Sequence, residues 1–74
     1  MDKVYRYTVE GSGNGGKTWK TEGSMTCAFE KVWLLAMADT FNQLTDGKAQ
    51  YGQPGVGCQG PYDIHKVVIE QVMQ

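Results

Sequence analysis

The stretch that decides the fold is KVYRYTVE, residues 3–10. Its side chains alternate, with Tyr5, Tyr7 and Val9 on one side of the chain and more polar residues on the other. Aromatic and β-branched residues that recur every second position are typical of a β-strand. Because one side of this strand is so strongly aromatic, we expect it to face the core, beneath whatever helix the chain forms.

A second strand is predicted over residues 17–25, after the glycine-rich turn GSGNGG. The two strands and their turn form a β-hairpin. A two-residue turn at Asn14-Gly15 would set the apolar side of one strand against the polar side of the other. A shift of one residue repairs this by pairing Val9 with Trp19. We therefore predict an odd-numbered loop of three or five residues, or a bulge in one strand.

A helix is predicted over residues 27–45, where the apolar period changes from two to three and four. Neither glycine nor proline interrupts this segment, which is rich in good helix formers. The apolar stripe consists of Phe29, Val32, Trp33, Ala36, Met37, Thr40, Phe41 and Leu44. Together with Trp19, the aromatic members of the stripe are expected to be core. Trp33 lies at the edge of the stripe and is the candidate for a surface anchor.

The last element, residues 62–72, favours a strand because it is rich in valine and isoleucine, with a short helix as the competing interpretation. The predicted fold is therefore α+β, ββαβ, in one domain over residues 1–74. Three antiparallel strands lie in the order 2-1-3, since the crossover is right-handed, and the helix packs on one face of the sheet. No remaining element covers the other face.

A long loop, residues 46–61, joins the helix to the last strand. It contains Gly55, Gly57 and Gly60 in the G-x-G-x-x-G spacing of dinucleotide-binding loops. In those folds the glycines follow a strand and open a helix, whereas here they follow a helix and precede Pro61 and a strand. No nucleotide or other cofactor is therefore expected. The loop is a winding crossover, a presented binding loop or a disordered segment.

Composition excludes several kinds of function. The chain has 74 residues, with seven Lys and Arg against eight Asp and Glu. A chain this short buries only about 60% of its unfolded surface, so it has little room for the deep cleft of a self-contained enzyme. The absence of a basic stripe disfavours nucleic acid. The N-terminus has no apolar leader and no run is long enough to span a membrane, so we expect a cytoplasmic protein.

The cysteines and the single histidine do not form a recognisable catalytic or metal site. Cys27 and Cys58 are expected to be free thiols in a reducing compartment, and the alternative is a disulfide between them. The C-x-x-C pairs of zinc sites are missing. Cys58, Asp63 and His65 lack the accompanying groups that nucleophilic catalysis requires.

The expected function is binding to another protein, without chemistry. The bare face of the sheet and the wide apolar girth of the helix favour an interface with a larger partner or a second copy of the chain. The predicted partner-binding residues are Arg6, Thr8, Lys20, Glu22, Trp33, Tyr51, Gln53, Val56, Gln59 and Tyr62. Size and class are typical of phage or mobile-element accessory proteins that inhibit or modulate a larger bacterial complex. The alternative is a nucleic-acid-binding module that uses outward-facing Tyr5 and Tyr7 with Arg6 and Lys20.

Overall fold

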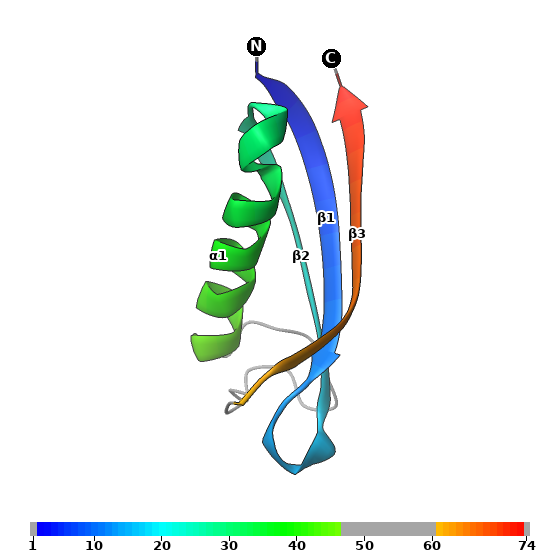
Figure 1. The fold of residues 1–74 in the computed structure, drawn as a ribbon, viewed down its shortest axis with the longest axis vertical. Helices are drawn as coiled ribbons and strands as arrows, with labels where there is room; N and C mark the ends of the chain where they lie inside the picture. Colours follow the sequence, from blue (N-terminus) through cyan, green and yellow to red (C-terminus); the bar gives the residue numbers. More distant parts are fainter. Residues whose placement is uncertain (1, 47–60, 74) are drawn as a thin grey trace.

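A computed structural model describes residues 2–46 and 61–73 of the chain. Its elements are β1 (Lys3–Ser12), a 3₁₀ turn (Asn14–Gly16), β2 (Thr18–Cys27), a second 3₁₀ turn (Phe29–Lys31), α1 (Val32–Thr45) and β3 (Asp63–Met73). The strands form one antiparallel sheet in the order β2-β1-β3, and α1 packs on one face of it (Figure 1). The α+β, ββαβ fold predicted from the sequence is confirmed.

The β1–β2 hairpin has an odd loop, as predicted, but its register differs by two residues. Val9 lies opposite Thr21, and Trp19 lies opposite Gly11. Both strands run further than predicted, β1 to Ser12 and β2 to Cys27, so the loop consists of residues 13–17. This five-residue loop contains three glycines. Two of them, Gly15 and Gly16, adopt φ of 83° and 76°, which glycine reaches without strain.

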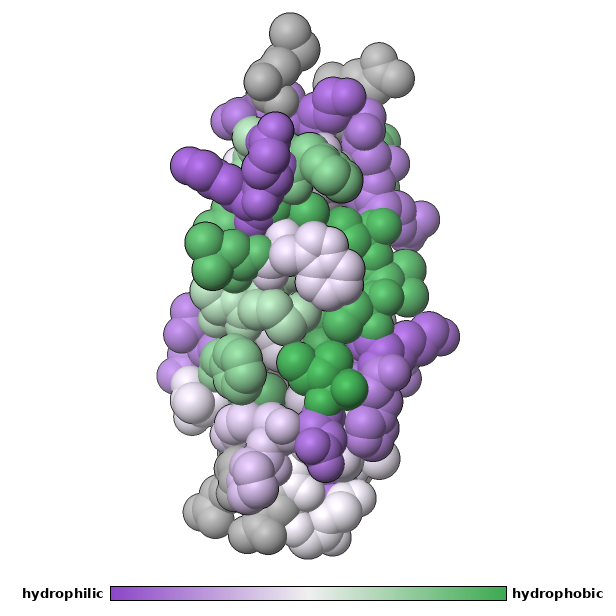
Figure 2. All heavy atoms as spheres, viewed as in Figure 1, coloured by the Kyte–Doolittle hydropathy of each residue, from purple (hydrophilic) through white to green (hydrophobic). Residues whose placement is uncertain are grey.

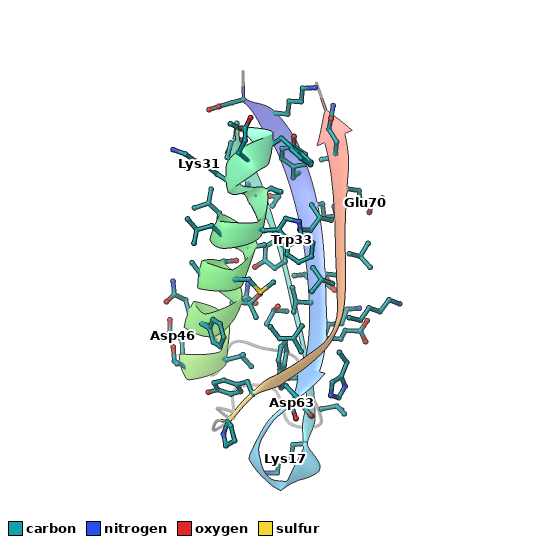
Figure 3. The ribbon with its side chains drawn as sticks, viewed as in Figure 1. Lys17, Lys31, Trp33, Asp46, Asp63 and Glu70 are labelled. Carbon is teal, nitrogen blue, oxygen red and sulfur yellow. The ribbon has the colours of Figure 1, made fainter. Side chains whose placement is uncertain are left out.

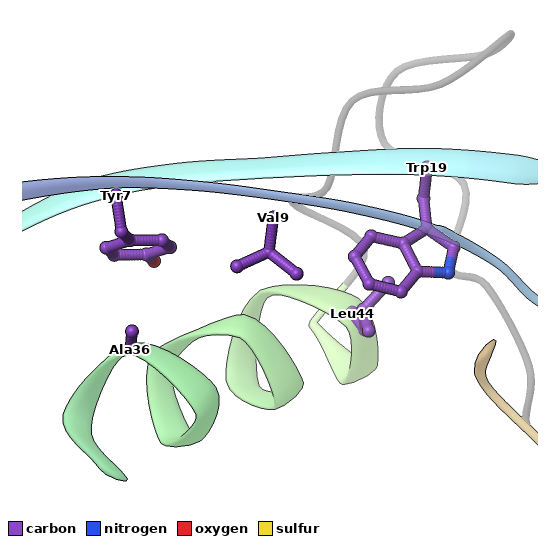
Figure 4. Packing of buried hydrophobic residues seen from close by; sticks show 5 residues of the cluster. All are labelled: Tyr7, Val9, Trp19, Ala36 and Leu44. Carbon is purple, nitrogen blue, oxygen red and sulfur yellow. The ribbon is translucent and has the colours of Figure 1, made fainter. Parts of the chain in front are cut away.

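The core lies between α1 and the aromatic side of β1. Tyr5, Tyr7 and Val9 are buried there, as the alternation in residues 3–10 predicts. Tyr7 and Val9 pack with Trp19 of β2 and with Ala36 and Leu44 of α1 (Figure 4). One buried polar pair joins the two layers, since the hydroxyl oxygens of Thr21 and Thr40 lie 3.0 Å apart.

The start of the helix corrects the prediction, because α1 begins at Val32 and not at residue 27. Cys27 still belongs to β2, opposite Lys3, and is a buried free thiol packed beside Tyr5 and Val32. The backbone turns only after Ala28, where the Lys31 N–H donates to the Ala28 carbonyl at 3.0 Å. Pairing with β1 therefore satisfies the backbone groups of residues 26 and 27, which a helix that began at residue 27 would have taken out of the sheet. Cys58 lies outside the described residues.

The last strand, β3, fits residues 63–73 without the short helix that the sequence left open. Its register with β1 shifts near each end, between Val4 and Tyr5 and between Glu10 and Gly11. At the second shift the chain passes so close to β1 that a Cβ added to Gly11 would lie 2.0 Å from the carbonyl oxygen of Asp63. Glycine at this position therefore leaves room for β3 to enter the sheet beside β1.

Candidate protein-binding surface

The apolar stripe of α1 is divided into two rows with different surroundings. The buried row consists of Val32, Ala36, Thr40 and Leu44. The open row consists of Phe29, from the turn before α1, with Trp33, Met37 and Phe41. Residues four apart lie above one another on a helix, so each row is a continuous ridge. One ridge packs on the sheet, and its neighbour is left at the edge of that contact.

The open row is exposed over most of its length. Phe29 is 70% exposed, Trp33 is 56% exposed and Phe41 is 43% exposed. Leu34, beside this row on the outward surface of α1, is 70% exposed. Trp33 projects from α1 toward the sheet in Figure 3, and Figure 2 shows apolar side chains gathered over α1 and β3 on this side. Exposed apolar side chains that lie along one ridge make this surface a candidate interaction site.

The open row lies on the β3 side of the helix. The ring of Phe41 lies 5.9 Å from that of Tyr62, immediately before β3. Tyr62 also meets Trp19 edge-on at 6.5 Å, so it ties the start of β3 to the core. Beneath the row, Val67 and Ile69 of β3 are only partly buried against the core. The sheet is therefore wider than the helix covers, and the exposed strip is β3.

A polar network on the opposite flank of α1 explains why the helix sits toward β2. The Tyr7 hydroxyl donates a hydrogen bond to the Asp39 carboxylate. The Gln43 amide nitrogen donates to the Tyr7 hydroxyl at 2.8 Å and to the Glu22 backbone carbonyl of β2 at 3.0 Å. These bonds fix α1 over β1 and β2. The open row therefore extends beyond β1, and β3 covers it only in part.

The same network changes the acidity of the tyrosine. Burial, and after it the hydrogen bond and negative charge of Asp39, raise the pKa of the Tyr7 hydroxyl far above its ordinary value of 10.0. Ionising Tyr7 would place a buried negative charge next to the charge of Asp39. Because the folded pKa lies above the unfolded one, this stabilisation is fully present below about pH 10 and is lost as the pH rises further.

We expect Tyr7→Phe to lower the free energy of unfolding by about 1–3 kcal/mol at neutral pH, because hydrogen bonds to charged groups contribute about this much. Above about pH 10 the wild type should lose stability more steeply than the variant, which has no hydroxyl at this position to ionise. Urea unfolding at a series of pH values measures both effects. Tyr5→Phe is the matched control, since its hydroxyl lies outside this network. Parallel pH profiles for wild type and Tyr7→Phe would contradict the prediction.

The sheet face turned away from α1, called the outer face here, carries four of the predicted site residues. Arg6, Thr8 and Glu22 line one open hollow of about 460 Å³. Lys20 lies beside them and forms an exposed ion pair with Glu22 at 3.4 Å. The structure thus brings these four together, but on the side of the sheet opposite to Trp33.

The other predicted site residues divide between the helix side of the sheet and the part of the chain that the structure does not describe. Trp33 is exposed as predicted, and Tyr62 lies against Phe41 at the C-terminal end of the open row. Tyr51, Gln53, Val56 and Gln59 lie outside the described residues. The prediction that Phe29 and Phe41 are core residues was wrong, because the helix stripe is broader than its contact with the sheet. No signal in the sequence separated them, because the spacing of four that unites both with Trp33 also unites the residues of the buried row.

Side chains that could take part in catalysis or bind a metal are sparse in the part of the chain that the structure describes. An exposed Ser12 hydroxyl lies 3.2 Å from Nε2 of His65, a contact that the sequence did not suggest. Among residues 2–46 and 61–73 there is no cluster of three side chains suited to a metal ion. Within these same ranges, no helix has the length and apolar character needed to cross a bilayer.

Comparisons with protein-family models, curated proteins and solved structures found no significant match to this chain. Inference about its function therefore depends on the surface that its own residues form.

Proposed function

We propose that this protein acts by binding another protein and performs no chemistry of its own. The contact surface is the open row together with Leu34. The observation that carries the proposal is the exposure of Phe29, Trp33 and Phe41 along one ridge, in a chain that buries two tyrosines and a tryptophan elsewhere. Leaving such side chains in water costs about 1.5–3 kcal/mol each relative to burial, and a partner would recover that energy.

The chemistry of this ridge indicates the kind of partner surface. Tryptophan is enriched among the residues that dominate binding energy, and these residues sit in dry pockets surrounded by a polar rim. Lys31 and Asp46, at the two ends of α1, supply polar groups at the margins (Figure 3). The fitting partner presents an apolar hollow that receives Trp33. The narrower proposal, an accessory protein that inhibits or modulates a larger bacterial complex, rests on an analogy of size and fold class alone.

The nucleic-acid alternative has less support. It requires Tyr5 and Tyr7 on the open face of the sheet for base stacking, whereas both are buried beneath α1. On the outer face, Lys20 and Lys66 both lie opposite Glu10 of β1, so positive and negative residues alternate across the sheet. Alternating signs do not form the positive track that follows a phosphate backbone.

Affinity capture with matched variants tests the proposal. A protein retained from lysate by the wild-type chain should be lost with Trp33→Glu and kept with Lys20→Glu, which changes the outer face instead. With that protein purified, Trp33→Glu should weaken binding at least about thirtyfold, the effect expected of a central aromatic residue. Loss of binding in Lys20→Glu alone would place the contact on the outer face, and retention of nucleic acid in place of protein would refute the proposal.

A further inference from the structure

The outer edge of β3 has the features of a strand edge that can form a β-ladder with another strand. β3 is the last strand in the order β2-β1-β3, and its outer edge meets no other strand among the described residues. Between its two register shifts, residues 66–71 pair with β1 without interruption. Proteins usually guard a long, regular edge, because its unpaired N–H and C=O groups attract another strand. Lys66, Val68 and Glu70 are exposed on this stretch.

We propose that β3 pairs with β3 of a second copy of this chain, antiparallel, about a two-fold axis through Val68. In this register residues whose numbers add to 136 lie opposite each other. The axis runs perpendicular to the sheet, so each copy contributes the same strand and the interface closes on itself. The result is one continuous sheet of six strands. This interface goes beyond the proposed function, since it uses β3 and a second copy instead of α1 and a different protein.

The amino-acid sequence of β3 is complementary to itself in this register alone among its near neighbours. Val68 meets Val68, Val67 meets Ile69 and Lys66 meets Glu70. A shift of one residue sets Lys66 against Ile69 or Val67 against Glu70. A shift of two sets Lys66 or Glu70 against Val68. Opposed apolar pairs and opposite charges are the pairs that stabilise antiparallel strands.

The charges continue the pattern that already exists within one copy. Across the outer face, Lys20 lies opposite Glu10, and Glu10 lies opposite Lys66. Lys66 would meet Glu70 of the second copy, and that Glu70 lies opposite its own Arg6. Five charges in a row then alternate in sign from β2 of one copy to β1 of the other. Each dimer contains this row twice, because of its symmetry.

The other sheet edge is less suited to pairing. β2 also carries opposite charges, but Lys20 and Glu22 are already joined within the chain at 3.4 Å. The backbone carbonyl of Glu22, in the middle of β2, accepts a hydrogen bond from Gln43 of α1. A strand that approached β2 would have to displace this side chain, whereas the described residues place no side-chain hydrogen bond on residues 66–71 of β3.

Pairing at β3 would also bring the apolar side chains of the two copies onto one face of the sheet. Paired residues in a sheet point to the same face, so α1 of each copy would lie on the same side of the six-stranded sheet. Val67 and Ile69 of both copies would form an apolar floor between the two helices. The two open rows would face each other across this floor.

Charge reversal tests the interface. The wild-type chain should sediment with the mass of two chains. Lys66→Glu and Glu70→Lys should each weaken self-association at least about tenfold, since each change creates two like-charge contacts by symmetry. The double variant Lys66→Glu with Glu70→Lys should restore the dimer. Within one copy the double variant still opposes like charges, at Glu10 and at Arg6. Its rescue therefore reports contact between copies.

A cysteine at the axis gives an independent test. Val68→Cys should form a linked dimer under mild oxidation, with the bond mapped to residue 68 in both chains, because only this position meets itself. A wild-type chain that sediments as one copy up to its solubility limit would overturn the proposal. Dissociation by Lys20→Glu would place the dimer at β2, and dissociation by Trp33→Glu alone would place it at α1, and both would overturn it. Partner capture lost in Trp33→Glu while the dimer persists separates this interface from the proposed function.

Discussion

Gly11→Ala should destabilise this protein more than any other removal or addition of a single methyl group in its sheet. The new Cβ would lie 2.0 Å from the carbonyl oxygen of Asp63 and 2.6 Å from the indole ring of Trp19. The first of these is backbone, so no rotamer change relieves the clash, and β3 has to move away from β1. We expect a loss of at least about 3 kcal/mol, the upper end of the cost of overpacking. A chain of 74 residues has only about 4–11 kcal/mol to lose.

Urea unfolding followed by circular dichroism measures this loss, and hydrogen exchange of the β3 amides shows where it acts. Gly16→Ala is the matched control, because a Cβ there meets nothing within 4 Å and the cost comes only from its φ of 76°. That cost is about 1–2 kcal/mol. If the two variants lost equal stability, the close approach of β3 to Gly11 would not be the reason for glycine at this position.

The alternation in β1 predicted which face of the sheet the helix covers. Residues such as Tyr5, Tyr7 and Val9 can be buried together only if one layer covers that side, and the chain has one helical segment to provide it. The order of the strands followed from the handedness of the crossover. The hairpin register was harder to predict from the sequence. Local alternation decides which faces match, but shifts of two residues preserve that match, so the sequence could not separate pairing Trp19 with Val9 from pairing it with Gly11.

The position of the helix on the sheet could not be predicted from periodicity. A stripe of apolar residues indicates which side of α1 is apolar and does not indicate how much of that side the sheet covers. Here the bonds of Gln43 and Asp39 to Tyr7, which join residues more than 30 apart, set the helix toward β2. The open row is the consequence. Phe29 and Phe41 were assigned to the core because their spacing is indistinguishable from that of Val32 and Ala36.

The helix α1 therefore has a buried apolar side and an exposed apolar side. One leucine on each side allows the two to be compared. Leu44 belongs to the buried row and is 1% exposed, in contact with the core around Trp19 and Val9 (Figure 4). Leu34 lies ten residues earlier on the same helix and is 70% exposed. Leucine and alanine are both strong helix formers, so exchanging one for the other changes the helix propensity little at either position. Any difference between the two substitutions then reports packing.

Leu44→Ala should lower the free energy of unfolding by about 2–5 kcal/mol, because it removes a buried side chain and leaves a cavity beside Trp19. Leu34→Ala should change it by no more than about 0.5 kcal/mol. Thermal and urea unfolding of both variants make the comparison. In the capture experiment the order should reverse, since Leu34→Ala keeps the fold and removes part of the partner surface. Equal losses of stability would mean that Leu34 is packed in the folded chain, and the proposed partner surface would then be part of the core of this protein.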